Sequence, residues 1–408
     1  MNFTYMLVAL LLSVCFGALP ITAEAVTFNV NSTDDAVDAF PGDGLCATVG
    51  GVCTLRAAIQ EANAFVGADT IVLKAKKYYL TIPGAADEVS ATGDLDITDS
   101  LTIRGVSSAQ TIINGGALDR VFEIIGPVVV RFINLSIQNG FKQTDIPYNG
   151  GAGIGNFGGT IYVTSCSVAN NIASGSAEIM GGGIFSTGTG SSLYIESSSV
   201  INNMVTSTTS YAFAGGIGAY DYDGGTLRIS ASKIAYNSAT STATDGSAAG
   251  GGIASAYGGR VTITNSKVLA NSALTFSGYT FGGGIGLEVD KRAAVIKKTI
   301  ISNNSSTSVG GGWAFGGGLC FHDEIVTINS CTIKGNRVSA PASNGFGGGV
   351  EAEFSSNVTI TNGSKIVQNL ASFDGGGILY GLWGEPTVTV SPDSTVANNM
   401  PNDRVGPP

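Results

Sequence analysis

Blocks of glycine closed by one aliphatic residue recur eight times, and this repeat constrains the fold more than any other feature. The closing residues are Ile154, Ile184, Ile217, Ile253, Ile285, Leu319, Val350 and Ile378. Each block leads through a short β-branched run to an asparagine, and the asparagines lie 30 to 34 residues apart at Asn171, Asn203, Asn237, Asn271, Asn304, Asn336, Asn369 and Asn399. A fixed period of this length is typical of a solenoid. A solenoid is a scaffold, so function has to be argued from individual sites.

The segments within one repeat are short and extended. Leu193-Tyr194-Ile195 is followed by Ser197-Ser198-Ser199-Val200, and Val261-Thr262-Ile263 shows the same alternation and β-branched bias in a later copy. No run is long enough for the helices of a leucine-rich or armadillo-type solenoid. The sequence therefore predicts an all-β solenoid, a parallel β-helix of about a dozen coils with eight regular repeats over residues 146–399. We expect the asparagines to hydrogen-bond along the axis and the glycines to allow positive φ at a turn.

The chain begins with the features of a secretory signal peptide. Met6 to Ala18 is an apolar run of thirteen residues, and the small-residue site Ala23-Glu24-Ala25 follows it. We expect a signal peptide over residues 1–25 and a secreted or cell-surface protein. No other apolar stretch is long enough for a transmembrane segment in the mature chain, and residues 400–408 read as a polar tail.

Charge is sparse and acidic. After the expected cleavage, 20 basic and 29 acidic residues remain, so the formal charge is 20 − 29 = −9. This balance argues against nucleic acid and against an anionic lipid surface as the partner.

Residues 26–145 form an N-terminal module of irregular first coils that contains the one strong helix signal. Thr54 can act as the N-cap, and an apolar stripe follows it at Leu55, Ala58, Ile59 and Ala62. A helix at this place would cover the open end of the β-helix and prevent edge-to-edge pairing.

Five cysteines remain after the expected cleavage. Cys46 and Cys53, seven residues apart before the helix, suit a disulfide in an oxidising compartment. Cys166 and Cys331 hold equivalent places five repeats apart, on the order of 24 Å at about 4.8 Å per coil, which is too far for a disulfide. We expect these two to be small buried side chains.

The segment Cys53-Thr54-Leu55-Arg56-Ala57-Ala58-Ile59, with Glu61-Ala62-Asn63 after it, resembles the Cys-Ser-Leu-Arg-Glu-Ala signature of bacterial secreted CSLREA-domain proteins. Ala57 stands where that signature has Glu. The Gly-Gly-Gly-Ile and Asn-Asn repeats look like the right-handed parallel β-helix repeats that follow it there, and they are similar to repeats of chlamydial polymorphic outer-membrane proteins. The resemblance implies a right-handed parallel β-helix with an N-terminal capping helix at the cell surface, adhesive or glycan-binding. It supplies no catalytic residues.

Aromatic residues recur six residues before the closing aliphatic. We expect Tyr211, Tyr279 and Trp313 to be the exposed members, on which sugar rings could stack. The alternative is a ladder of rings that packs the loops onto the coil, and both interpretations stay open. Phenylalanines four residues before the closing aliphatic are instead expected in the core, at Phe213, Phe281, Phe315 and Phe346.

A second series lies about three residues after the closing aliphatic, on the outward side of the strand. It includes Tyr220, Tyr257, Glu288, His322 and Glu353. We expect Glu288, His322 and Glu353 on three successive coils, roughly 5 Å apart, with the two tyrosines beside them as ligand-binding residues. His322 is the only histidine, and a histidine between carboxylates can act as a general base. The alternative is a solvated polar strip, which is the simpler interpretation.

Signals for metals and cofactors are weak. Carboxylates close to this strip could bind Ca²⁺, namely Asp290, Asp323, Glu324 and Glu351. No set of Cys and His has the spacing of a zinc site, so no metal ligands and no certain cofactor are predicted.

Most signatures of catalysis are missing. The chain lacks the Asn-Thr-Asp and Gly-His-Gly motifs of a polygalacturonase-like hydrolase, its Asp-Asp pair at Asp34-Asp35 precedes the repeats, and it has no Gly-x-Ser-x-Gly nucleophile elbow. The one dense basic cluster that could neutralise a uronate is Lys291, Arg292, Lys297 and Lys298. We therefore favour non-catalytic binding of a polysaccharide or another cell-surface component, through the loop-bearing edge and the adjacent outward strip. The alternatives are a polysaccharide lyase or epimerase that uses His322 between Glu288 and Glu353, and a purely structural envelope protein.

Overall fold

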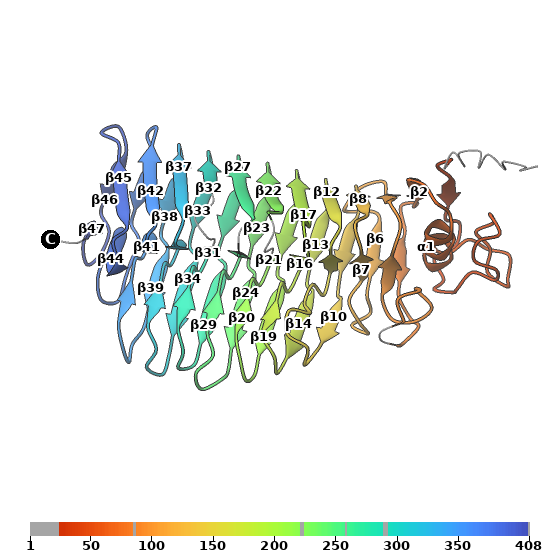
Figure 1. Ribbon diagram of the computed structural model, residues 1–408, viewed down its shortest axis with the longest axis horizontal. Coiled ribbons are helices and arrows are strands. Elements are labelled where there is room, and N and C mark those ends of the chain that lie inside the picture. The colour runs from red at the N-terminus through yellow and green to blue at the C-terminus, as the bar shows by residue number, and fades with distance from the viewer. Residues whose placement is uncertain (1–23, 85–86, 221–223, 258, 289–292, 407–408) are drawn as a thin grey trace, which may run out of the picture.

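The protein is a long solenoid of stacked parallel strands (Figure 1). A computed structural model describes residues 24–84, 87–220, 224–257, 259–288 and 293–406. One coil runs from sheet C through sheets A, B, D and E and back to sheet C, and each sheet pairs parallel strands of successive coils. The predicted all-β parallel solenoid is confirmed.

Sheets A, B and C form the body of the solenoid. Sheet A has 12 strands: β1 (Thr27–Asn29), β2 (Asp69–Val72), β5 (Leu101–Arg104), β8 (Val129–Ile133), β12 (Thr160–Thr164), β17 (Ser192–Glu196), β22 (Thr226–Ser230), β27 (Arg260–Thr264), β32 (Ala293–Lys297), β37 (Ile325–Asn329), β42 (Asn357–Thr361) and β45 (Thr387–Val390). Sheet B has 11: β3 (Lys77–Tyr79), β6 (Ile112–Asn114), β9 (Ser136–Gln138), β13 (Ser167–Ala169), β18 (Ser199–Ile201), β23 (Lys233–Ala235), β28 (Lys267–Leu269), β33 (Ile300–Ser302), β38 (Thr332–Lys334), β43 (Lys365–Val367) and β46 (Thr395–Ala397). Sheet C also has 11: β4 (Leu95–Ile97), β7 (Phe122–Ile125), β11 (Ile154–Phe157), β16 (Ile184–Thr187), β21 (Ile217–Tyr220), β26 (Ile253–Ala256), β31 (Ile285–Glu288), β36 (Leu319–His322), β41 (Val350–Phe354), β44 (Ile378–Gly384) and β47 (Arg404–Val405).

Sheets D and E are smaller. Sheet D has seven strands: β10 (Phe141–Gln143), β14 (Ile172–Gly175), β19 (Met204–Ser207), β24 (Ser238–Ser241), β29 (Ser272–Thr275), β34 (Ser305–Ser308) and β39 (Arg337–Ser339). Sheet E has six: β15 (Ile179–Met180), β20 (Ala212–Phe213), β25 (Ala248–Ala249), β30 (Thr280–Phe281), β35 (Ala314–Phe315) and β40 (Gly345–Phe346). Residues 404–405 of the expected polar tail form β47, which pairs with β44.

The main core lies inside sheets A, B and C. The closing aliphatic of each glycine block points inward, and Ile184 of β16, Leu193 of β17 and Val200 of β18 are each at most 1% exposed. Burying one such side chain contributes about 1.5–3 kcal/mol relative to leaving it in water. Every coil repeats this contribution, so the sequence period becomes a continuous core.

Sheets D and E pack against each other through small side chains, including Ala173, Ala212 and Ala239. Alternate residues of sheet E point the other way, toward the outer face of sheet C, where Met180 packs with Phe185 of β16. A second apolar layer therefore forms outside the main core, and this layer carries the site described below.

The eight asparagines form a buried ladder, as predicted. The Asn203 side-chain amide donates to Oδ1 of Asn237 over 3.0 Å, and the backbone N–H of Asn203 donates to the same oxygen over 2.9 Å. The second amide hydrogen goes to the carbonyl of Val168. Because each asparagine satisfies buried donors of its neighbour, this corner needs a carboxamide or carboxylate in every coil.

The glycine blocks also behave as predicted. Gly181, the first residue of one block, has φ 67°, and Ala214 takes the same conformation at φ 59° in the degenerate copy. A Cβ on Gly183 would lie 2.7 Å from the carbonyl oxygen of Gly216. Glycine is thus favoured at the first position of the block for its conformation, which Ala214 also adopts, and it is required at the third position for the close approach of successive coils.

The N-terminal end of the solenoid is covered by α1 (Leu55–Ala64), as the sequence predicted (Figure 1). Oγ1 of Thr54 accepts from the backbone N–H of Ala57 over 3.1 Å, which confirms the N-cap. The guanidinium of Arg56 is fully buried and donates to Asp35 over 2.7 Å. The expected signal peptide lies outside the described residues except for Glu24 and Ala25.

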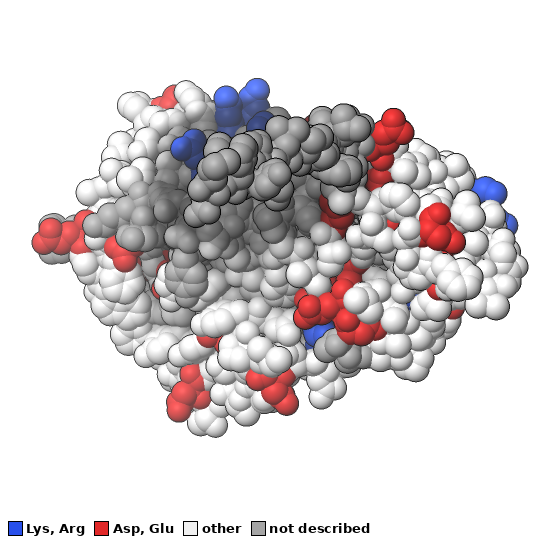
Figure 2. Space-filling model, turned by 45° about the vertical axis from the view of Figure 1, so that its right-hand side comes forward, with Lys and Arg blue, Asp and Glu red and all other residues white. Residues whose placement is uncertain are grey.

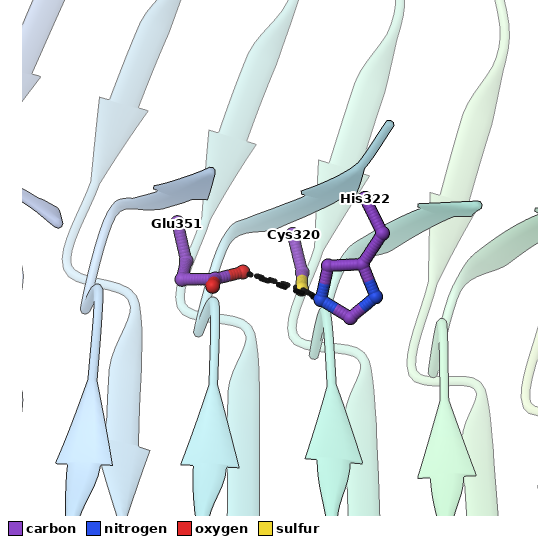
Figure 3. Close-up of side chains that lie close together, drawn as sticks. All are labelled: Cys320, His322 and Glu351. Carbon is purple, nitrogen blue, oxygen red and sulfur yellow. Dashed lines mark hydrogen bonds and ion pairs between the residues drawn. The ribbon is translucent and has the colours of Figure 1, made fainter. Parts of the chain in front are cut away.

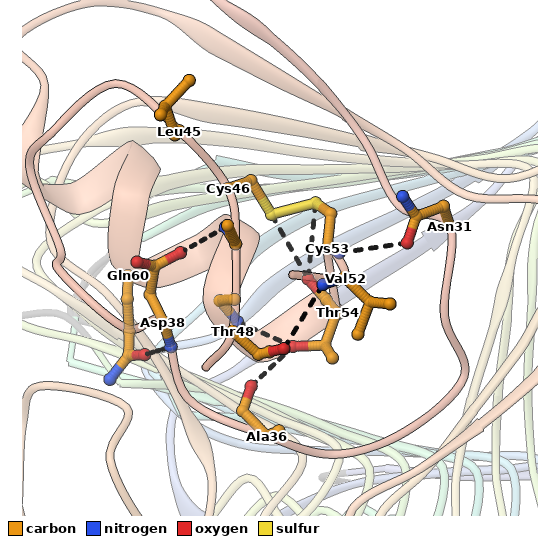
Figure 4. The surroundings of a disulfide bond; sticks show 12 residues. Asn31, Ala36, Asp38, Leu45, Cys46, Thr48, Val52, Cys53, Thr54 and Gln60 are labelled. Carbon is orange, nitrogen blue, oxygen red and sulfur yellow. Dashed lines mark hydrogen bonds between the residues drawn. A yellow bond between two sulfur atoms is a disulfide. The ribbon is translucent and has the colours of Figure 1, made fainter. Parts of the chain in front are cut away.

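The cysteine predictions are confirmed. Cys46 and Cys53 form a disulfide beside α1, and Figure 4 shows it next to Thr54. Cys166 and Cys331 are free and buried, on the turn between sheets A and B.

Charged side chains are sparse on the surface. Figure 2 shows isolated Asp and Glu side chains on a mostly uncharged face, with few Lys and Arg among them. No helix among the described residues is long and apolar enough to cross a membrane.

Candidate functional site

A groove lies between sheet E and the outer face of sheet C. It encloses about 380 Å³ and runs from Met180 of β15 to His322 of β36. Its lining is rich in aromatic residues, with Tyr148, Tyr211, Phe213, Tyr220, Tyr257, Tyr279 and Phe281. A hollow of this size falls within the range of small-molecule sites.

The groove exists because the outward residue that follows the closing aliphatic is small in three successive coils. Gly218, Ala254 and Gly286 occupy this register position and form the floor. Phe185 holds the same position at one end and Cys320 at the other, and both are buried. We did not predict this run of small residues, although each of them directly follows the closing aliphatic of its repeat.

Tyr211 and Tyr279 stand at the edge of sheet E, two coils apart, with Ser247 between them. Their side chains are 41% and 47% exposed, as expected for residues that meet a ligand. Each ring also contacts a phenylalanine of its own strand, at 5.9 Å between the centroids of Tyr211 and Phe213.

The opposite wall carries the other two predicted tyrosines in a different arrangement from the one expected. Tyr220 is only 4% exposed, because its ring packs between Tyr148 at 4.7 Å and Tyr257 at 4.9 Å. Tyr257 is 46% exposed, but Ala256 and not Tyr257 is the register partner of Glu288. Tyr257 lies four residues after the closing Ile253, one residue beyond the end of β26, with φ 62°.

Trp313 was expected to be exposed together with Tyr211 and Tyr279, and the structure differs from this prediction. It is half-buried, and its ring stacks on Trp383 at 5.5 Å and meets Phe346 edge-on at 5.7 Å. It lines a separate hollow near the C-terminal end and not the tyrosine groove. The length of β44 explains the difference, because its seven residues bring Trp383 over Trp313.

The phenylalanine series divides into two groups. Phe315 and Phe346 are buried and stacked at 5.7 Å, which agrees with the core expectation. Phe213 and Phe281 are half-buried and line the groove. The division follows from the neighbouring coil, where Ala249 is too small to cover either ring.

Glu288, His322 and Glu353 are register partners on β31, β36 and β41, as the spacing predicts. Glu288 and His322 line the groove. Glu353 differs from the expected outward strip, because it is fully buried and accepts from the backbone N–H groups of Leu382 at 3.1 Å and Trp383 at 2.5 Å. Glu288, at one end of the expected series, therefore lines the groove, whereas Glu353, at the other end, is buried.

Burial changes the pKa values of His322 and Glu353. Burial lowers the pKa of His322 from 6.5 to about 4, so its imidazole is neutral near pH 7. The ring lies edge-on between Phe281 at 5.1 Å and Phe354 at 5.3 Å. Burial also raises the pKa of Glu353.

Cys320, His322 and Glu351 bring three possible metal ligands together at the end of the groove (Figure 3). The Cys320 thiol donates to Oε2 of Glu351 over 2.7 Å, while Nε2 of His322 lies 3.5 Å from the sulfur and 3.9 Å from that oxygen. Burial raises the pKa of Cys320 and that of Glu351 well above their usual values. Sequence reasoning missed this cluster because Glu351 lies one full repeat after Cys320.

The carboxylates expected near a Ca²⁺ site do not converge in the described residues. Asp290 lies outside them. Asp323 accepts from the backbone of Ser355, and neither Asp323 nor Glu324 joins the cluster of Glu351. Lys291 and Arg292 of the basic cluster also lie outside the described residues.

A second carboxylate cluster lies near the N-terminal end, at Asp94, Asp96 and Glu123. The buried guanidinium of Arg120 lies 3.1 Å from Asp94 and 3.5 Å from Glu123. Because this cluster already contains a cation, we interpret it as a structural charge network.

A sequence model described as a right handed beta helix region matches residues 183–399, more than half of the chain. No curated protein and no solved structure matches the chain. The matched region contains most of the asparagine ladder and the floor of the groove. The chain belongs to the right-handed β-helix family.

Proposed function

We propose that this protein binds a saccharide segment in the groove between sheet E and sheet C. The observation that carries the proposal is the pair Tyr211 and Tyr279, half-exposed rings two coils apart on the sheet E wall of a groove floored by Gly218, Ala254 and Gly286. Two coils separate the tyrosines by roughly 9.6 Å. This spacing accommodates a sugar ring between two aromatic side chains.

The polar groups of the groove favour an uncharged glycan. Glu178, Ser247 and Glu288 can accept hydrogen bonds from sugar hydroxyls, and tyrosine hydroxyls can donate or accept. The described lining contains no Lys or Arg. A polyuronate would therefore bring carboxylates next to Glu178 and Glu288 without a compensating cation.

Display outside the cell fits this role. The Cys46–Cys53 disulfide is typical of an oxidising compartment, and the apolar N-terminal run supports export. We further propose that the segment around α1 is a CSLREA-type cap, on the strength of the resemblance of Cys53–Asn63.

Glycan binding by groove variants tests the proposal. Tyr279→Ala is expected to weaken binding of a neutral glycan about two- to tenfold through lost stacking alone, since one stacked ring contributes about 0.5–1.5 kcal/mol beyond its buried area. Tyr236→Ala is the matched control, because Tyr236 is 57% exposed after β23 and does not line the groove. A panel of neutral and acidic glycans, read by calorimetry, supplies the ligand.

Filling the groove is a sharper test, because it leaves every tyrosine in place. Ala254→Phe puts a ring where Phe185 stands two coils earlier in the same register. The variant is expected to fold and to lose glycan binding. Unchanged binding by a folded Ala254→Phe would exclude this groove as the site.

A polysaccharide lyase or epimerase is the second candidate, since Glu288 and His322 line the groove from adjacent strands. This activity predicts turnover of a uronate polymer that disappears in His322→Ala. Retention of a glycan without product would favour the binding protein. Self-association without either result would favour a structural role.

A further inference from the structure

We propose that Cys320, His322 and Glu351 bind a divalent transition metal of the Zn²⁺ type at the end of the groove. Cys320 and His322 lie two residues apart on β36, so their side chains leave the same face of the strand. Glu351 is the register partner of Cys320 on β41. The stacking of two coils thus gathers three ligands that are remote in sequence.

The distances suit a small ion. In a tetrahedral site with Zn–S of about 2.3 Å and Zn–N or Zn–O of about 2.0 Å, ligand atoms lie roughly 3.3–3.5 Å apart. The observed separations are 3.5 Å for sulfur to Nε2, 3.9 Å for Nε2 to Oε2 and 2.7 Å for sulfur to Oε2. To place an ion between the three atoms, the distance from sulfur to Oε2 must open by roughly 0.8 Å and the distance from Nε2 to Oε2 must close by roughly 0.6 Å.

The charge balance also points to a cation. Glu351 and Glu353 are both fully buried, and no Lys or Arg among the described residues forms an ion pair with either. The two carboxyls share a side-chain hydrogen bond, so at least one of them holds a proton, and Oε1 of Glu351 has no other hydrogen-bond donor among the described residues. A bound divalent ion would replace such protons and allow the buried carboxyls to ionise.

The surroundings resemble the outer shell of a metal site. Phe281 and Phe354 hold the His322 ring edge-on from both sides, which fixes its orientation. Backbone N–H groups of Leu382 and Trp383 hold Glu353 next to the Glu351 carboxyl. Such support keeps ligand atoms in place and tunes affinity.

The donor set selects the metal. Thiolate and imidazole favour zinc and related ions, whereas Ca²⁺ and Mg²⁺ prefer oxygen ligands throughout. Three protein ligands leave a tetrahedral ion one open position. Cys320 and His322 line the groove and Glu351 lies behind them, so the open position faces the groove.

Metal uptake by the full chain tests the site and does not depend on any saccharide. The protein is stripped with a chelator, dialysed against Zn²⁺ or Co²⁺, and analysed for metal content and Co²⁺ absorption. We expect one ion per chain and a sulfur-to-cobalt charge-transfer band. Cys320→Ser should abolish the band, and both Cys320→Ser and His322→Gln should lower the Zn²⁺ affinity at least about tenfold.

Cys331→Ser is the matched control, since Cys331 is another free buried cysteine on the far side of the core. It should keep the band and the affinity. Circular dichroism of each metal-free variant tests whether it is folded. If Cys320→Ser does not fold, the Zn²⁺ affinity of Glu351→Gln is measured instead. A folded wild-type chain without stoichiometric uptake, or a band that survives in Cys320→Ser, would overturn the proposal.

Discussion

Asp403 ends the asparagine ladder by taking the place of a ninth asparagine. Its Oδ1 accepts from the backbone N–H of Asn399 over 2.9 Å and from the Asn399 side-chain amide over 3.0 Å. These are the two bonds that each asparagine from Asn203 onward receives from the coil before it, as Asn399 itself does from Asn369. The carboxylate thus satisfies donors that would otherwise be left at the open end of the solenoid.

Asp403→Ala should therefore destabilise the last coil. The change leaves two donors of the nearly buried Asn399 without their acceptor, and we expect a loss of about 1–3 kcal/mol. Asp403→Asn keeps the accepting oxygen and should lose much less. Hydrogen exchange measures both effects, with faster exchange at Asn399 in the alanine variant and little change at Asn203. Equal losses in the two variants would contradict the capping role.

Gly183→Ala should destabilise the fold more than an ordinary glycine substitution. The new Cβ would lie 2.7 Å from the carbonyl oxygen of Gly216 and 2.9 Å from the Asn203 side chain, so two coils must separate. We expect a loss of about 1–3 kcal/mol in urea unfolding, in the range for overpacked sites. Gly259→Ala is the control, because its nearest neighbour is 3.3 Å away. Equal stability of the two variants would show that the coils can separate freely.

Most of the solenoid could be predicted because its determinants repeat. One period places Asn171 above Asn203 and Ile184 above Ile217, so the ladder and the core follow from spacing alone. The N-terminal helix was readable for another reason, since the N-cap Thr54 and its apolar stripe are local signals. Both features depend on residues that lie close in the chain or recur in register.

The site was harder to predict because it depends on departures from the repeat. Glu353 is buried by Leu382 and Trp383, which belong to the extended strand β44. A register shift lies next to Phe354, and no other sheet C strand in the described part of the chain is as long as β44. Tyr257 lies one residue beyond Ala256, which is the register partner of Glu288. Reasoning from the repeat alone places every side chain at one register position in the same surroundings. The irregular coils, however, determine which of these side chains line the groove.

Trp313→Ala should separate packing from binding. Trp313 stacks on Trp383 and contacts Phe346 outside the groove, so its removal should cost about 1–3 kcal/mol of stability. Glycan binding at Tyr211 and Tyr279 should not change. Thermal denaturation and calorimetry of the same sample measure both quantities. Lost binding at full stability would place the ligand on Trp313 instead.

The N-terminal carboxylate cluster predicts that stability falls as the pH rises. Asp96 is 2% exposed, and burial raises its pKa from 3.8 to about 6 although Ser90 donates to it over 2.8 Å. Glu123 raises the pKa further. Burial also raises the pKa of Asp94 to about 8, against the opposing effect of Arg120.

A carboxyl with a raised folded pKa binds its proton more tightly in the folded state. Its contribution to stability is complete below the unfolded pKa near 3.8 and is lost as the pH rises through about 6 for Asp96. Asp96→Asn keeps the acceptor for Ser90 and removes the charge, so it should raise stability at pH 8 by about 2 kcal/mol and have little effect at pH 4. Urea midpoints at pH 4, 6 and 8 provide the measurement. A variant that follows the same pH dependence as the wild type would show that Asp96 is already ionised and accommodated in the fold, with Arg120 as the cation that balances it.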